Sequence, residues 1–541
     1  MNSRRHQLAL KLLPSMADFA FLLPIMFLFG RMDGVKTLLG DGDTGWHIRT
    51  GEWILSNRQV PANDLFSYTK PGQPWVAWEW LSEVVLAWLN AHGGLASVLL
   101  ASVLIIAVTF ALLFRLARRK SSPAAAFLVL PFAIATSSVH WLARPHLFSL
   151  LFLVLFYSVL DEVRCGRTSI FGIPFLALLP GATILWANLH AGFFTGIVLI
   201  ACFGAGEALK LILAPDNSSL STERARAKAY FVTAMACLAA SLLNPYSYHL
   251  HSHVLRYVVD PYQSQHIMEF LTLSFHHPVA LFFECLLGAG LAAARWSVAH
   301  GSYTEAVLIL VWGHAALLAA RNLPLFAIVA TPIVAAALDQ FFARLPGLEV
   351  AAWLRRGAAR FLAMLRETGE IEAAPRWHVA SAAAVLVLAA LLYAPAPPPV
   401  FRAEYDPAAY PAAAIPVLQS DRSGRIFTTA EWGGYLIYRL YPGIRVFIDG
   451  RSDFYGGNFG EKYIDVIKAK YGWRKTLSEA GVDTILLPPS AELCGALKEA
   501  SDWRIAYDDG VALIFRAVHK ERDDIVPDAP SAVSAGISSG G

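Results

Sequence analysis

The sequence predicts a polytopic helical membrane protein with a small C-terminal α/β unit. Of its 541 residues, 56% are hydrophobic and only 16% are charged, whereas soluble globular proteins carry about 25% charged residues. The hydrophobic residues also come in long blocks rather than at a period of 3.6 or 2, and blocks of about 18 apolar residues are typical of membrane spans. The net charge of +3 gives no indication of a nucleic-acid partner.

About eleven apolar blocks are predicted to span the membrane. The first follows Arg4, Arg5 and Lys11, and because no small-residue cleavage site comes after it, we expect an uncleaved span with a cytoplasmic N-terminus. Several later blocks are short and are expected to pair as half-buried hairpins. The predicted blocks cover residues 16–29, 95–114, 124–140, 146–160, 169–186, 192–213, 229–243, 279–294, 305–320, 323–341 and 378–395.

The distribution of lysine and arginine predicts the orientation of these spans. Cytoplasmic loops are enriched in both residues, and the loops assigned to that side hold basic clusters, as at 115–120 and 224–228. The turns on the other side are nearly bare of basic residues apart from the long first loop, and an odd number of spans places the C-terminal region outside. Residues 346–368, apolar at helical spacing with an arginine face, predict an interfacial helix on the cytoplasmic leaflet.

The chain changes character after a stiff proline-rich linker at 394–400. Short β-type runs alternate with helical stretches from there on, which predicts a small α/β unit. We therefore divide the chain into a membrane part over 1–400, with its first outside loop at 33–80, the α/β unit over 401–519, and a disordered tail over 520–541. The expected strands are 425–429, 445–450, 483–488 and 511–517, and the expected helices are 461–480 and 490–501.

Ionisable and amide side chains gather at the outer ends of many different predicted spans. Such groups are costly at membrane depth unless they are paired or hydrated, so they indicate function by default. The inside loops show no comparable content of His, Asn and Asp, and this one-sided distribution predicts one hydrated cavity that opens outward. The residues concerned are Asp41, Asp43, His47 and Arg49 of the first loop, and Arg144, His146, Asn188, His190, Glu269 and Arg321 of later turns.

Each of these features also has a structural explanation. An Asp-Gly-Asp sequence is common in turns, tryptophans near a boundary are usually interfacial anchors, and His190 would also satisfy a neighbouring helix. In the α/β unit, Gly433 and Gly434 predict a tight turn. Asp449, Arg451 and Asp453, after a predicted strand, either face the membrane cavity or form a structural ion-pair network.

The segment DGDTGWHIR at 41–49 resembles the first outside loop of the GT-C superfamily of membrane glycosyltransferases. That superfamily includes the oligosaccharyltransferase catalytic subunits, the protein O-mannosyltransferases and the aminoarabinose transferases. Asp43, Trp46, His47 and Arg49 echo the DPYYHLR-like stretch of oligosaccharyltransferases, and the likeness in architecture covers roughly residues 1–400. The segments WANLHAGFFTG (186–196) and ARNLPLF (320–326) look like those of uncharacterised bacterial members. No WWD-type acceptor motif occurs in the C-terminal region after residue 400, which argues against transfer to protein asparagine.

The resemblance implies a glycosyltransferase with a polyprenyl-phosphate-linked sugar donor, embedded among the lipids of a bacterial cytoplasmic (inner) membrane. Asp41 or Asp43 is then the expected catalytic base, and if a divalent ion such as Mg²⁺ or Mn²⁺ is used, the same pair would ligate it. Arg144 and Arg321 are expected to grip the phosphate, because guanidinium pairs bidentately with it. The other expected substrate contacts are His47, Arg49, His146, Asn188, His190 and Glu269.

Two other functions are left open by the sequence. A transporter or flippase for a lipid-linked sugar would need polar residues near the bilayer midplane, often in broken helices. A non-catalytic scaffold of an envelope polysaccharide system would tolerate replacement of the first-loop aspartates. A single outward cavity shared by Asp41, Asp43, Arg144 and Arg321 would favour the enzyme, because substrate contacts act over hydrogen-bond distances.

Overall fold

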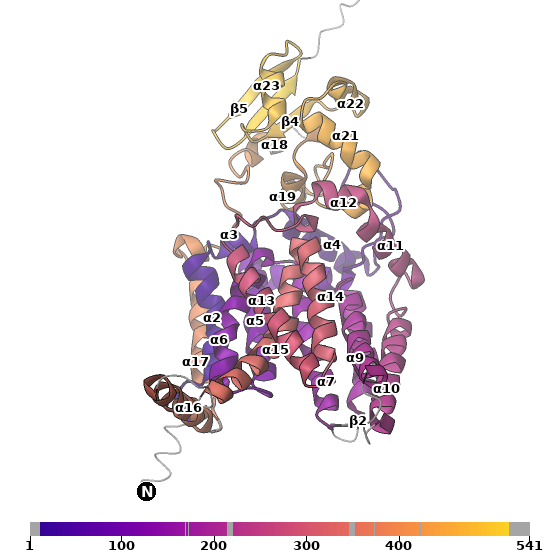
Figure 1. Ribbon diagram of the computed structural model, residues 1–541. Coiled ribbons are helices and arrows are strands. Elements are labelled where there is room, and N and C mark those ends of the chain that lie inside the picture. Colours follow the sequence, from indigo (N-terminus) through magenta and orange to yellow (C-terminus); the bar gives the residue numbers. More distant parts are fainter. Residues whose placement is uncertain are drawn as a thin grey trace, which may run out of the picture.

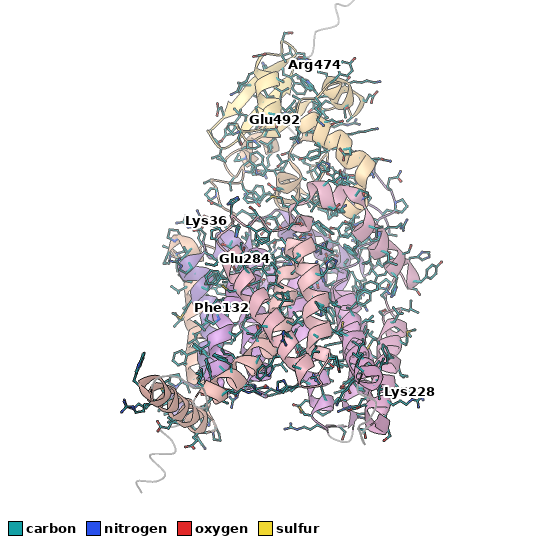
Figure 2. The ribbon with its side chains drawn as sticks, in the orientation of Figure 1. Lys36, Phe132, Lys228, Glu284, Arg474 and Glu492 are labelled. Carbon is teal, nitrogen blue, oxygen red and sulfur yellow. The ribbon has the colours of Figure 1, made fainter. Side chains whose placement is uncertain are left out.

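The computed structural model describes residues 11–167, 169–170, 173–213, 220–345, 352–372, 374–420 and 424–518. Long helices run side by side in the lower part of Figure 1, and the C-terminal unit, orange to yellow, sits on one end of this bundle. We call this the capped end. In Figure 2, Lys36 lies at the capped end, whereas Lys228, from a loop predicted to be cytoplasmic, lies at the opposite end.

Each predicted apolar block contains a helix in the structure, although the block predicted at 169–186 begins with the short strands β1 and β2, so that its helix starts only at Phe175. By length and composition, six helices of the described chain are long and apolar enough to cross a membrane, and α8, α14 and α17 are shorter apolar helices. The total of about eleven spans therefore stays a prediction. The helices that correspond to the predicted blocks are α2 (Met16–Arg31), α5 (Trp80–Ala117), α6 (Pro123–Ser137), α7 (His146–Arg164), α8 (Phe175–Leu189), α9 (Phe193–Leu213), α10 (Leu220–Ala240), α13 (Ala280–Ala299), α14 (Thr304–Leu318), α15 (Leu323–Arg344) and α17 (Val379–Leu392).

Helix α5 begins at Trp80, well before the apolar block predicted from residue 95. Its first part is separated from the rest by a kink at Gly93 and Gly94, where the backbone leaves helical geometry. This first part packs against α4 (Asp43–Asn57), the main helix of the first loop. The contact is close because a Cβ on Gly51 would lie 1.9 Å from the Glu83 carbonyl oxygen. The polar end of α5 is thereby fixed beside the residues of the first loop.

A four-stranded sheet forms the centre of the C-terminal unit (residues 401–518). Its order is β3-β4-β6-β5, with β3 parallel to β4 and the other pairs antiparallel. The strand predicted at 445–450 is wrong: Val446 makes only single bridges, one to Ile426 and one to Ser67 of the first loop. The strands are β3 (Ile426–Phe427), β4 (Thr484–Leu487), β5 (Trp503–Asp508) and β6 (Leu513–Ala517), and the helices are α18 (Ile415–Ser420), α19 (Ala430–Leu440), α20 (Ser452–Tyr455), α21 (Gly457–Ile467), α22 (Trp473–Glu479) and α23 (Glu492–Lys498).

The tight turn predicted at Gly433 and Gly434 is also wrong, because both glycines lie inside helix α19. This helix packs directly on α4. A Cβ on Gly434 would lie 2.6 Å from the Gly42 carbonyl oxygen, so the absence of a side chain is what lets the two helices meet. The glycine pair thus serves helix packing rather than chain reversal, and it attaches the C-terminal unit to the segment that carries Asp43.

The remaining elements lie at the two ends of the bundle. The predicted interfacial helix corresponds to α16, which Figure 1 shows at the end opposite the C-terminal unit; its first predicted residues, 346–351, and the tail 520–541 lie outside the described residues. The segment between α10 and α13 carries three short helices close to the C-terminal unit (Figure 1). The remaining described elements at the two ends of the bundle are α3 (Val35–Leu38), η1 (Ser138–His140), β1 (Ser169–Ile170), β2 (Ile173–Pro174), α11 (Tyr248–Val259), α12 (Pro261–His266), η2 (Met268–Phe270), η3 (Ala320–Asn322), α16 (Ala352–Glu372) and η5 (Pro399–Phe401).

Candidate functional site

A cavity of about 500 Å³ lies at the capped end of the bundle, between the helix ends and the C-terminal unit. The start of α7 and the end of α14 form part of its wall, and residues 450–453 of the C-terminal unit close it from the other side. Its apolar wall includes Phe194, Val258 and Leu318. Its ionisable wall consists of Asp43, Glu79, His140, Arg144, His146, His190, Glu269, Arg321, Arg451 and Asp453.

Arg144 is the centre of an ion-pair cluster in this cavity. Its Nη1 lies 2.8 Å from Asp41 Oδ2, and its Nη2 lies 3.1 Å from Asp43 Oδ2. A third carboxylate, Glu269, is 3.7 Å from Nη1. Asp43 is the first residue of α4, where a negative charge is favoured by the helix dipole. One guanidinium therefore holds two neighbouring aspartates of the first loop and a glutamate that is far away from them in sequence.

Glu269 connects this cluster to the second predicted phosphate ligand. Its Oε1 lies 3.2 Å from Arg321 Nη1, and its Oε2 lies 3.5 Å from His140 Nε2. The Arg321 guanidinium stacks on the Phe270 ring at 4.5 Å, which fixes its plane. The structure thus brings Asp43, Arg144 and Arg321 together in the wall of one cavity, with Glu269 between the two arginines. Asp41 does not line this cavity and joins the cluster only through its ion pair with Arg144.

A second chain of contacts runs through Glu79, which was not predicted as a site residue. Its Oε1 lies 3.3 Å from His190 Nε2 and its Oε2 lies 3.6 Å from His47 Nε2. Ser149 Oγ fixes the other nitrogen of His190 at 2.7 Å. Glu79 and His190 line the cavity, whereas His47 lies behind Glu79 and does not. The only signal for Glu79 in the sequence was an acidic residue between two tryptophans near the end of the first outside loop.

The pKa values of the cavity carboxyl groups are shifted in different directions, because burial raises them and the nearby arginines lower them. Burial raises the pKa of Asp43 to about 7, although Arg144 opposes the shift, and it raises the pKa of Glu79 to about 8. Burial acts in the same sense on Glu269, but Arg321 and Arg144 outweigh it and lower the pKa to about 2. At neutral pH Glu269 is therefore a fixed negative charge, whereas Asp43 is able to take up or release a proton.

Arg451 joins the C-terminal unit to the first loop from within the cavity wall. Its Nη2 lies 2.7 Å from Asp449 Oδ2 and 2.8 Å from Asp64 Oδ1, and only 1% of the residue is exposed. Its Nη1 is buried without a hydrogen-bond partner among the described residues. Both interpretations of the 449–453 segment therefore hold in part, since Arg451 is a member of an ion-pair network and, like Asp453, lines the cavity.

Three residues expected to contact substrate do not line the cavity: His47, which lies behind Glu79, and also Arg49 and Asn188. Arg49 Nε donates to the Tyr438 carbonyl at 2.9 Å, so this side chain joins α4 to α19. Asn188 accepts a hydrogen bond from Trp80 Nε1 at 2.8 Å and donates to the Leu243 carbonyl at 2.9 Å. Neither lines the cavity, because both side chains are used to hold neighbouring elements together. By contrast His146, as predicted, lies in the cavity wall.

The predicted divalent-ion ligands do not fit a metal in this arrangement. The two Asp43 oxygens already meet Trp46 Nε1 and Arg144, and the two Asp41 oxygens meet the Asp43 amide and Arg144. An ion between them would stand against the Arg144 guanidinium, and no group of three or more His, Cys, Asp or Glu side chains within the described ranges is placed to hold one. The positive charge in the cluster comes from arginine.

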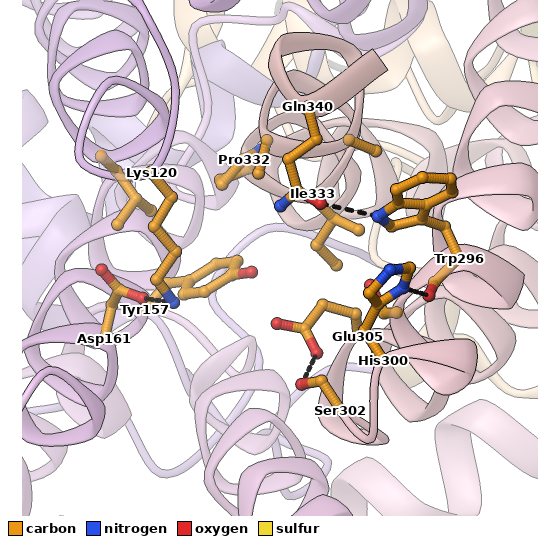
Figure 3. Close-up of a pocket in the computed structure, with 14 residues that line it drawn as sticks. Lys120, Tyr157, Asp161, Trp296, His300, Ser302, Glu305, Pro332, Ile333 and Gln340 are labelled. Carbon is orange, nitrogen blue, oxygen red and sulfur yellow. Dashed lines mark hydrogen bonds and ion pairs between the residues drawn. The ribbon is translucent and has the colours of Figure 1, made fainter. Parts of the chain in front are cut away.

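A second cavity, of about 390 Å³, lies at the opposite end of the bundle. Figure 3 shows Lys120, Asp161, Trp296 and Glu305 around it. Trp296 Nε1 donates to Gln340 Oε1 at 2.6 Å, and Lys120 Nζ pairs with Asp161 Oδ1 at 2.5 Å. None of the predicted site residues lines this cavity, so the two cavities are separate features.

Comparison with known proteins relates the chain to one kind of enzyme by its fold. No protein-family profile matches the sequence, and no curated protein sequence matches it. The structure is similar to the crystal structure of the Archaeoglobus fulgidus oligosaccharyltransferase in the apo form, with a TM-score of 0.50 and 11% sequence identity over 95% of this chain and 75% of that chain. At this identity the likeness shows the fold alone. The chain therefore shares the overall fold of a solved oligosaccharyltransferase, in agreement with the resemblance found in the first loop.

Proposed function

We propose that this protein is a membrane glycosyltransferase that moves a sugar from a polyprenyl-phosphate-linked donor to an extracytoplasmic acceptor. The proposal depends on one observation: a buried carboxyl group, Asp43, and two arginines, Arg144 and Arg321, line the same cavity at the capped end of the bundle. The fold likeness to an oligosaccharyltransferase supports it. The acceptor would be an envelope glycan, a lipid or a protein, and the membrane would be a bacterial cytoplasmic membrane with the C-terminal unit outside.

The proposed reaction needs a base for the acceptor and positive charge for the leaving group. Asp43 takes the proton of the acceptor hydroxyl while the oxygen of that hydroxyl bonds to the anomeric carbon of the sugar. The bond between that carbon and the phosphate oxygen breaks, and the released phosphate is stabilised by the guanidinium groups of Arg144 and Arg321. A carboxyl group whose pKa is about 7 suits a base at neutral pH, because a large fraction is ionised and still accepts protons.

The neighbouring acidic residues act in this scheme by positioning. Asp41 holds Arg144 from the side through its 2.8 Å ion pair. Glu269 lies between Arg144 and Arg321 and keeps the two guanidinium groups from repelling each other. Arg451, which also lines the cavity, is held in place by Asp449 and Asp64.

The apolar part of the cavity wall suits a lipid-linked donor. Val258 and Leu318 line the cavity and are also 58% and 59% exposed on the surface of the molecule. A polyprenyl chain whose phosphate lies at Arg144 and Arg321 would leave the cavity along these side chains into the surrounding lipid. Such a path for the polyprenyl chain accounts for the exposure of the two apolar side chains beside the ion-pair cluster.

Replacement of Asp43 tests the proposal. Purified wild-type protein and Asp43→Asn are reconstituted in liposomes with a panel of polyprenyl-phosphate sugars, and release of polyprenyl phosphate is measured. We expect at least about a 100-fold loss of transfer in the variant, the usual effect of removing a general base, and no loss in Asp502→Asn, whose side chain is 54% exposed on the C-terminal unit.

The same assay separates the enzyme from its rivals. Full activity of Asp43→Asn would overturn the assignment of the base. Movement of an intact lipid-linked sugar across the bilayer without bond cleavage would favour a transporter. Complementation of a deletion strain by Asp43→Asn, as judged by its envelope glycans, would favour a scaffold.

A further inference from the structure

The C-terminal unit carries a second concave surface, separate from the ionic cavity. Two hollows of about 380 and 580 Å³ adjoin each other there and share Phe459 and Lys462. They lie between first-loop residues 68–70 and the helices α21 and α22. We call this surface the tail groove and define it by Tyr68, Lys70, Arg425, Phe459, Lys462 and Tyr471.

The tail groove presents aromatic rings: Tyr68 and Phe459 pack on the core of the C-terminal unit with one part exposed, and Tyr471 does not pack on it at all. Tyr471 is fully exposed at the start of the turn before α22, and Tyr68 and Phe459 are partly exposed in the floor. Exposed rings beside polar groups are typical of binding surfaces, where a flat apolar face is kept available for a partner. The C–H faces of sugar rings pack on such rings, while their hydroxyl groups bond to the polar residues around them.

The charge of the tail groove is predominantly positive. Lys70, Arg425 and Lys462 form no ion pair with a carboxylate in the part of the chain that the structure describes. Lys70 Nζ donates to the Tyr455 carbonyl at 2.6 Å, and Arg425 Nη1 donates to the Ala480 carbonyl at 3.0 Å. The acidic residues of the groove are paired, Asp465 with Lys470 at 2.8 Å and Glu479 with Lys475 at 3.7 Å. The groove therefore favours an anionic ligand.

The tail groove is one layer of side chains away from the ionic cavity. Tyr455 lines the groove, and its hydroxyl donates to Asp449 Oδ2 at 2.8 Å. Asp449 holds Arg451, which lines the cavity. The Lys70 ammonium lies over the Phe454 and Tyr455 rings on the groove side, at 5.4 and 5.9 Å. A chain-like ligand in the groove would thus lie beside the cavity wall.

From these observations we infer that the tail groove binds an acidic glycan strand, with its sugar rings on the aromatic side chains and its carboxylate or phosphate groups on the three cations. This inference rests on the proposed function, since it assigns the strand as the acceptor of the transferred sugar. It limits the acceptor to a polymer that carries negative charge.

Direct binding tests the inference without a transfer assay. Full-length protein in nanodiscs is titrated calorimetrically with hexagalacturonate as the acidic probe and with maltohexaose as the neutral one. We expect hexagalacturonate to bind and maltohexaose to bind at least about tenfold more weakly. Tyr471→Ala and Lys462→Glu should each weaken hexagalacturonate binding about tenfold, as truncation of an anchor does. Lys468→Glu, on the same segment but not in the groove, should leave it unchanged.

The outcomes separate this inference from the proposed function. Equal binding of both probes, or loss of binding in Lys468→Glu equal to that in Lys462→Glu, would overturn the tail groove as an acidic-glycan site even if Asp43-dependent transfer is observed. Binding with the expected variant pattern but no Asp43-dependent transfer would support the groove and refute the enzyme. Folding of the variants is checked by their thermal unfolding.

Discussion

At the scale of single residues, the ionisation of Asp43 determines when the proposed reaction can run. The base must be ionised, and burial places its pKa at about 7. We expect kcat/KM to rise about tenfold per pH unit below that value and to level off above it. Because Arg144 lowers the pKa of Asp43, Arg144→Gln should move this rise to higher pH in addition to slowing transfer.

The shift of the profile distinguishes the roles of the two arginines. Arg321 lies on the far side of Glu269 and forms no ion pair with Asp43 among the described residues. Arg321→Gln should therefore slow transfer but leave the pH at which kcat/KM rises almost unchanged. A rate that is independent of pH from about 5 to about 9 would exclude Asp43 as the base, because a general base must show its pKa in kcat/KM.

At the scale of elements, the contact between α4 and α19 decides whether the C-terminal unit stays attached above Asp43. A Cβ on Gly434 would meet the Gly42 carbonyl oxygen at 2.6 Å, and a backbone atom has little room to move. Gly434→Ala should therefore lower the free energy of unfolding by about 1–3 kcal/mol, as overpacking does. Gly495→Ala in α23, where nothing lies within 4 Å, should be neutral or stabilising. Thermal unfolding in detergent measures both, and equal stability of the two variants would contradict the packing argument.

The same contact shows what sequence patterns miss. The apolar blocks were predicted well because their length alone favours helices in a membrane. Helix α19 was missed because its Gly-Gly pair disfavours helix locally, and only the close approach of α4 explains it. In the site, Asp43, Arg144, Glu269 and Arg321 could be predicted as unusual polar groups at span ends. Arg49 and Asn188 belong to the same class of polar residues, yet their use in packing depends on partners far away in sequence.

At the scale of the whole molecule, the orientation of the protein in the membrane can be tested with one residue at each end of the helix bundle. Tyr471 lies fully exposed on the C-terminal unit, and the native Cys165 is exposed just after α7, whose other end borders the ionic cavity. The proposal puts Tyr471 outside and Cys165 in the cytoplasm. In a Cys285→Ser background, which removes the other exposed thiol, the cysteine introduced by Tyr471→Cys should react with a membrane-impermeant maleimide in intact spheroplasts. Cys165 should react only after permeabilisation. The reverse pattern would put the cavity on the cytoplasmic side, where an extracytoplasmic acceptor could not reach Asp43, and would refute the proposed function as a whole.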